Sequence, residues 1–222
     1  MIMGKLIVIE GLDGSGKSTQ IEILLKRLEN EGFNPFEIKL PYYGDESSTL
    51  VKMYLSGQFG SKPGDVNAYA ASTFFSVDRY ASFKKFWSRQ YNEGRLILSD
   101  RYTTSNAVHQ MTKLNKDMWD SYGEWLFDFE YNKLGIPAPD CVIFLDMPVD
   151  VSQKLMTKRY EGDENKKDVH ERDVEYLYSC YNAALYASEK FGWHVIKCSE
   201  NGEPRSIREI SEDIYNCVIK YL

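Results

Sequence analysis

The eight residues 11–18, GLDGSGKS, follow directly after the apolar run LIVI at residues 6–9. They match the phosphate-binding pattern G-x-x-x-x-G-K-[ST], in which glycines let backbone N–H groups surround phosphate oxygens. In such a loop Lys17 adds positive charge and the Ser18 hydroxyl is a ligand for Mg²⁺. The motif needs a strand before it and a helix after it, so it predicts both. We expect a nucleotide phosphate site formed by Gly11, Gly14, Ser15, Gly16, Lys17, Ser18 and Thr19.

Predicted strands and helices alternate along the rest of the chain. The apolar runs predict strands at residues 6–9, 36–40, 96–98, 142–145 and 194–198. Helical spacing predicts a first helix from the loop to about residue 32 and further helices at 45–57, 66–92, 114–134, 149–159, 171–191 and from 206 onwards. In the last helix, the predicted inward-facing residues are Ile207, Ile210, Ile214 and Val218. This alternation favours an α/β fold with a doubly wound parallel sheet of about five strands flanked by helices. The 222 residues suit a single domain.

Composition excludes several classes of partner. The net charge of −6 argues against a large surface for polymeric nucleic acid. Cys141, Cys180, Cys198 and Cys217 are far apart without a C-x-x-C pair, so their spacing predicts neither a zinc site nor a disulfide framework. No run reaches the roughly 18 apolar residues of a membrane span. We expect a cytoplasmic protein with reduced cysteines.

Charged side chains at the ends of predicted strands indicate a second anion site. Asp100 and Arg101 end the third apolar run, Tyr43 follows the second, and Arg79 lies in an otherwise apolar helical turn. Ligands of open α/β sheets bind at the carboxyl ends of the strands. Residues 160–170, YEGDENKKDVH, are too polar to pack and predict a mobile lid at about 159–170. Several cations and a lid that excludes water favour a Mg²⁺-dependent kinase with two anionic substrates.

Two other segments imitate the motifs of a GTPase switch. Residues 165–168 fit the guanine-reading pattern N-K-x-D, but no apolar strand precedes them. Residues 120–123 fit D-x-x-G, but they lie inside a predicted helix. We interpret both as coincidental.

The chain resembles bacterial thymidylate kinases over nearly its whole length. The resemblance is carried by GLDGSGKSTQ after the first strand, Phe75 four residues before Arg79, Asp100-Arg101-Tyr102, Ser105-Asn106, Pro137-x-Pro139-Asp140 and Asp168-x-x-Glu171. It implies a fold of the P-loop kinase type and the reaction ATP·Mg²⁺ plus dTMP giving ADP plus dTDP. It also implies a cytoplasmic homodimer.

The resemblance implies roles for the residues near the phosphates. Lys17 spans the β- and γ-phosphates, and Ser18 holds Mg²⁺. Asp13 bonds the sugar 3′-hydroxyl of the acceptor or a metal-bound water, with a turn-stabilising role as the alternative. Arg101 binds the acceptor phosphate, which suits bidentate guanidinium geometry. Asp100 either holds Mg²⁺ through water or orients Arg101.

Further positions match the part of the family site that binds the thymidine moiety. Phe75 corresponds to the aromatic residue that stacks on thymine, and Arg79 to the arginine that contacts base and phosphate. The Asn106 amide has the donor and acceptor that a pyrimidine edge needs. Tyr43 falls near the acceptor phosphate. The remaining predicted dTMP contacts are Ser105, His109, Asp168 and His170, the two histidines standing where relatives often have tyrosine.

The chain departs from one branch of the family at Gly14, where that branch has an arginine. The catalytic cation is therefore expected from the lid, with Arg159, Lys166 and Lys167 as candidates. The alternatives to a dTMP kinase are a kinase for another nucleotide or deoxynucleoside and, with less support, a nucleotide-dependent switch or binding module.

Overall fold

A computed structural model describes residues 3–159 and 174–222. Its centre is a five-stranded sheet in the order β2-β3-β1-β4-β5. All four strand pairs are parallel. The strands are β1 (Lys5–Glu10), β2 (Phe36–Lys39), β3 (Leu96–Asp100), β4 (Cys141–Asp146) and β5 (His194–Lys197). Each coincides with one of the predicted runs, although β2 and β5 end one residue earlier than predicted, and the predicted α/β fold is confirmed.

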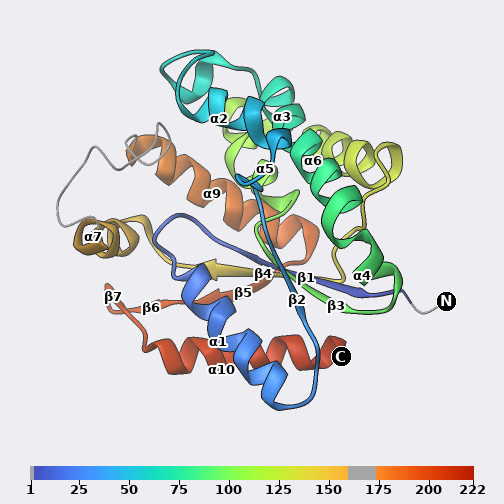
Figure 1. Cartoon of the computed structure of the whole chain (residues 1–222). Helices are drawn as coiled ribbons and strands as arrows, with labels where there is room; N and C mark the ends of the chain where they lie inside the picture. Colours follow the sequence, from blue (N-terminus) through green and yellow to red (C-terminus); the bar gives the residue numbers. More distant parts are fainter. Residues whose placement is uncertain (1–2, 160–173) are drawn as a thin grey trace.

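Helices cover both faces of the sheet (Figure 1). On one face lie α1 (Lys17–Asn30) and α10 (Ile207–Val218). On the other lie α3 (Ala68–Ser82), α4 (Ser88–Asn92), α5 (Thr104–His109), α6 (Trp119–Phe127) and α9 (Val174–Phe191), with α2 (Thr49–Leu55) and α7 (Val149–Arg159) toward the periphery. In the described ranges no helix is long and apolar enough to cross a membrane.

Short elements connect or extend these helices and strands. They are the 3₁₀ turns Glu46–Ser48, Pro63–Asp65, Met111–Lys113, Lys116–Met118 and Ile219–Tyr221, the π-helical segments Phe83–Trp87 and Asp128–Lys133, and the hairpin of β6 (Ser199–Glu200) and β7 (Glu203–Pro204).

The sheet separates two layers of core. Ile21, Leu24 and Leu28 of α1 pack with Ile214 of α10 against one face of the sheet. Burial of each such side chain contributes about 1.5–3 kcal/mol. The other layer joins α5, α6 and α9, where small residues such as Ala183 let the helices approach closely.

The structure differs from the sequence-based prediction in several details. The β6–β7 hairpin was not predicted, and the predicted helix 114–134 is divided into a 3₁₀ turn, α6 and a π segment. Three further differences have a clear physical reason. The predicted helix 66–92 contains the π turn Phe83–Trp87, whose extra residue shifts the helical phase so that Trp87 is fully buried. Helix α5 was not predicted, because six residues rich in β-branched and polar side chains form a stable helix only through tertiary packing. Ile207 was expected inward but is 56% exposed, since it begins α10 at the end of the packed face.

Gly4, just before the central strand, leaves no room for a side chain. A Cβ there would lie 2.3 Å from the Arg95 carbonyl oxygen and 2.8 Å from that of Tyr91. Both oxygens belong to the backbone at the end of α4 and just before β3, and not to flexible side chains, so they cannot easily move away. We therefore expect Gly4→Ala to lower the free energy of unfolding by about 1–3 kcal/mol in urea denaturation. Gly64→Ala is the matched control, because a Cβ there meets nothing within 4 Å. Equal stabilities of the two variants would contradict this packing.

Candidate active site

The phosphate loop joins the carboxyl end of β1 to the first turn of α1. Gly14 and Gly16 have φ angles of 78° and 88°, in the left-handed region that favours glycine. A Cβ on Gly14 would also lie 2.8 Å from the Ser152 carbonyl oxygen of α7. The predicted loop residues Gly11 and Ser15 are buried within the loop. The loop therefore has the conformation that its glycines predict.

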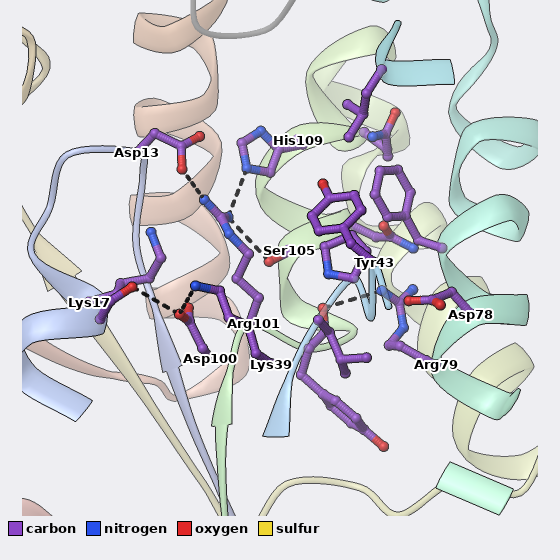
Figure 2. Close-up of a pocket in the computed structure, with 18 of the residues that line it drawn as sticks. Asp13, Lys17, Lys39, Tyr43, Asp78, Arg79, Asp100, Arg101, Ser105 and His109 are labelled. Atoms are coloured by element: carbon purple, nitrogen blue, oxygen red, sulfur yellow. Dashed lines mark hydrogen bonds and ion pairs between the residues drawn. The ribbon is translucent and has the colours of Figure 1, made fainter. Parts of the chain in front are cut away.

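A cavity of about 380 Å³ opens beside this loop at the carboxyl edge of the sheet (Figure 2). It brings together residues that are far apart in sequence. The predicted site residues in its lining are Asp13, Gly14, Gly16, Lys17, Ser18, Thr19, Tyr43, Phe75, Arg79, Asp100, Arg101, Ser105, Asn106 and His109. Lys166, Lys167, Asp168 and His170 lie outside the described residues, and Arg159 ends α7 with its side chain also outside them.

Lys17 lies at the floor of the loop and is only 7% exposed. Its ammonium donates to the carbonyl oxygens of Gly11, at 2.8 Å, and Leu12, at 2.9 Å. Burial and the nearby charge of Arg101 lower the pKa of Lys17 to about 8. An anion in the loop would restore its usual affinity for the proton.

Arg101 lies at the centre of the charged side of the cavity (Figure 2). Its Nη2 is 2.7 Å from Asp13 Oδ1, and its Nη1 is 3.3 Å from His109 Nε2 and 3.5 Å from Ser105 Oγ. Burial opposes its charge, but Asp13 and Glu10 outweigh burial and raise the pKa of Arg101. Burial alone would raise the pKa of Asp13, yet Arg101 and Lys17 lower it well below its usual range. The pair is therefore fully ionised.

The backbone of Arg101 has a φ of 68°, which is uncommon outside glycine. Its amide donates to the Ile9 carbonyl at 3.1 Å. Such left-handed residues persist where surrounding structure enforces them, and they concentrate at functional sites. The turn lets β3 end at Asp100 while the next side chain enters the cavity.

Glu10 is a site residue that sequence reasoning missed. Its carboxylate is fully buried and accepts from the Gly11 amide at 2.9 Å, from Thr104 Oγ1 at 2.8 Å and from Ser105 Oγ at 2.7 Å. Arg101 Nη1 lies 3.5 Å from the same carboxylate. A charged residue that ends an otherwise apolar strand just before the loop was the available signal. Glu10 thus ties the loop, α5 and Arg101 together.

Arg79 and Glu130 form a second buried ion pair. Arg79 is 3% exposed and Glu130 is fully buried, and Arg79 Nε lies 2.7 Å from Glu130 Oε2. Ser76 Oγ and Thr103 Oγ1 each donate to this carboxylate at 2.8 Å. Glu130 was also missed, because 51 residues separate it from Arg79. The pair holds a flat guanidinium in the cavity lining with its charge compensated.

Asp100, Ser18 and Lys39 form a polar group beneath the loop. Ser18 Oγ lies 3.3 Å from Asp100 Oδ2, and Lys39 Nζ lies 3.7 Å from the same oxygen. Hydroxyl and carboxylate oxygens are the donors that Mg²⁺ prefers. The residues present therefore fit a magnesium ion. Lys39 was not predicted as a site residue, although it ends β2 at the same edge.

Gln110 is an unexpected residue in the lining of the cavity. It is fully buried, lines the cavity, and neither its amide nitrogen nor its amide oxygen has a hydrogen-bond partner among the described residues. It lies four residues after Asn106, whose amide donates to the Ser72 carbonyl at 3.3 Å. The i, i+4 spacing of two amides was the signal available in the sequence. A buried amide without a partner is costly and indicates a ligand contact.

Comparison with known proteins identifies the class of site. A family model described as thymidylate kinase matches residues 9–210. The chain belongs to the thymidylate kinase family. The sequence-based prediction of an ATP-dependent kinase for dTMP is thereby confirmed.

The alignments with individual relatives cover most of the chain. Thymidylate kinase of Mycobacterium tuberculosis is 29% identical over 174 residues, 77% of this chain and 79% of that protein. A probable thymidylate kinase of Thermococcus gammatolerans is 31% identical over 159 residues, 71% and 72% of the two chains. The enzyme of Halothermothrix orenii is 26% identical over 220 residues, 98% of this chain and 99% of its own.

A solved structure supports the same fold. The thymidylate kinase of Candida albicans matches with a TM-score of 0.72 at 22% identity, over 99% of this chain and 92% of that one. Residues 120–123, which imitate a GTPase switch, lie in α6, as expected for a coincidental match.

The lowered pKa of Lys17 predicts proton uptake on ATP binding. Near pH 8 the free protein holds about half a proton on Lys17, and bound phosphate restores the full charge, so binding takes up about half a proton. Calorimetry at pH 8 in buffers of different ionisation enthalpy measures this number. Lys17→Met, measured at higher ATP concentration, should show no such uptake. Proton release by the unaltered protein would contradict the lowered pKa.

Proposed function

We propose that this protein transfers the γ-phosphoryl group of ATP directly to the phosphate of dTMP, without a covalent intermediate. The observation that carries the proposal is one cavity lined both by the phosphate loop and by Gln110, whose buried amide has no hydrogen-bond partner among the described residues. Between them lies Arg101, ionised and held by carboxylates. Two anionic substrates fit this arrangement, because each has its own cations and the reacting groups meet between them.

At the donor end, the loop amides and Lys17 bind the β- and γ-phosphates of ATP. Ser18 and Asp100 are the residues that would hold Mg²⁺, which when bound neutralises charge on the phosphate oxygens. The sequence left two roles open for Asp100: holding Mg²⁺ through water, or orienting Arg101. The contacts of Asp100 with Ser18 and Lys39 favour the first.

At the acceptor end, Arg101 binds the phosphate of dTMP. Its guanidinium is already oriented by Asp13, Glu10 and Ser105, so little reorganisation is needed when the anion arrives. Asp13 lies between the two phosphate sites and suits a contact with the sugar 3′-hydroxyl. Tyr43 and His109 complete the polar wall on the acceptor side.

We place the base beside Phe75 and Gln110, which both line the cavity. Phe75 stacks on the thymine ring, while Gln110 and Asn106 offer donors and acceptors to its edge. Arg79 contributes N–H groups from a guanidinium whose charge Glu130 compensates. Thymine supplies the partners that Gln110 lacks among the described residues.

Residues outside the described ranges complete the proposal. Because Gly14 brings no charge, a cation of the lid at about 159–170 acts on the transferring phosphoryl group, with Arg159, Lys166 and Lys167 as candidates. Asp168 and His170 contact dTMP. The protein acts as a single-domain kinase and a cytoplasmic homodimer.

Acceptor choice tests the function. We expect ADP release from ATP to depend on an added acceptor and to be fastest with dTMP among dTMP, dUMP, UMP, dCMP and thymidine, measured by a coupled assay. Preference for another monophosphate would make this a kinase for that nucleotide. Transfer to thymidine would move the acceptor atom from phosphate to hydroxyl. Acceptor-independent hydrolysis, or none, would favour a switch or binding module.

Gln110 tests base recognition. Gln110→Leu should lower kcat/KM for dTMP about 10–100-fold while KM for ATP stays unchanged, because one amide contact to the base is lost. The same change should stabilise the free protein, since it removes an unpartnered buried amide. Gln90→Leu is the matched control: its Oε1 is also buried without a partner, but Gln90 is absent from the described cavity lining. Equal kinetics of the two variants would contradict a base contact.

A further inference from the structure

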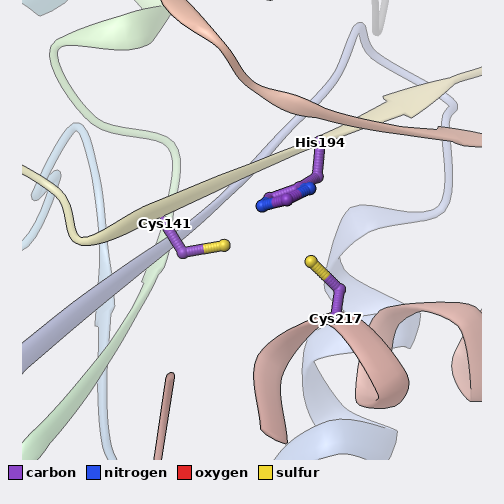
Figure 3. A group of neighbouring side chains, drawn as sticks. All are labelled: Cys141, His194 and Cys217. Carbon is purple, nitrogen blue, oxygen red and sulfur yellow. The ribbon is translucent and has the colours of Figure 1, made fainter. Parts of the chain in front are cut away.

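Three metal-ligating side chains converge at the amino edge of the sheet, opposite the phosphate loop. Cys141 is the first residue of β4, His194 the first of β5, and Cys217 lies in the last turn of α10 (Figure 3). Because all strands are parallel, these amino ends lie a full strand length from the loop, roughly 20 Å for six residues. The catalytic proposal uses none of the three.

The ligand atoms are close enough to share one ion. The two Sγ atoms and one imidazole nitrogen all lie within 4.8 Å of one another. Any three points with such separations have a common point within about 2.8 Å of each, and zinc bonds are about 2.3 Å to sulfur and about 2.0–2.1 Å to nitrogen. Each ligand atom therefore needs to move by less than about 1 Å. Within the residues that the structure describes, this is the one such group of three histidine, cysteine or acidic side chains.

The surroundings favour a bound ion over simple core packing. The exposed His194 ring is held in place by Tyr221, whose hydroxyl lies 2.7 Å from His194 Nε2. Fixed orientation of a histidine ligand by an outer hydrogen bond is typical of metal sites. A second cavity, of about 190 Å³, is lined by Cys141, His194 and Tyr221 but not by Cys217. Two of the three ligands therefore border a space with room for a water ligand.

We propose that Cys141, His194 and Cys217 bind one Zn²⁺ ion, with water as the fourth ligand. Two sulfur donors and one imidazole suit zinc and not the hard, oxygen-preferring Mg²⁺ of the phosphate site. Binding releases the two thiol protons to solvent, and no electrons are transferred. The ion links the end of α10 to the first residues of β4 and β5, so it stabilises the C-terminal helix on the sheet. The proposal does not depend on the proposed function.

Cobalt is the spectroscopic probe for this site. The reduced full chain is titrated with CoCl₂ in excess MgCl₂, which occupies oxygen-ligand sites, and one equivalent should produce thiolate-to-cobalt charge-transfer absorption that ZnCl₂ abolishes. Zinc should also raise the thermal unfolding midpoint, because it binds the folded chain preferentially. His194→Ala and Cys217→Ser should weaken binding about tenfold or more. Cys198→Ser is the matched control, since Cys198 is buried and outside the group.

Each alternative outcome is decisive. Absence of the charge-transfer band in the unaltered protein overturns the proposal, as does equal binding by Cys217→Ser and Cys198→Ser. A Cys141–Cys217 disulfide found by mass spectrometry, with no zinc binding after reduction, would make the group a redox pair instead. His194→Ala alters an exposed side chain, so circular dichroism should show an intact fold and keep the binding comparison valid.

Discussion

The buried carboxylate of Glu10 is the interaction on which the arrangement of the active site depends. It ends the central strand and accepts hydrogen bonds from the first amide of the phosphate loop and from two hydroxyls of α5. Because a buried carboxylate needs such partners, it fixes the loop relative to α5. The same group faces Arg101, so the phosphate loop and this arginine are positioned by one side chain.

Charge balance explains how so many ionic groups lie in one small cavity. Arg101 is paired with Asp13 and Glu10, Arg79 with Glu130, and Asp100 with Lys39. Lys17 is held by two carbonyl oxygens, and burial lowers its pKa. Substrate phosphates entering this cavity meet oriented dipoles and cations, which is the electrostatic preorganisation that phosphoryl transfer needs.

The strands, most helices and much of the candidate site could be predicted from the sequence. The apolar runs locate the five strands of the central sheet, but not the β6–β7 hairpin. Resemblance to the family places Phe75, Arg79, Asn106 and Arg101 together, as the cavity does. The π turn at Phe83–Trp87 and the exposure of Ile207 could not be predicted, because they depend on where neighbouring elements end. The sequence did not predict Gln110 as a site residue, because this role is indicated only by its burial without a partner among the described residues.

The sequence by itself determined the phosphate loop, because all the glycines and backbone N–H groups that form it lie within eight consecutive residues. Only the tertiary structure decided which partners orient the cations: Glu10 for Arg101 and Glu130 for Arg79 lie 91 and 51 residues away. The same holds for Cys141 and Cys217, whose spacing predicts no metal site although their sulfur atoms converge. Packing of parallel strands and their helices brings such residues together, and a local sequence pattern does not predict contacts between distant residues.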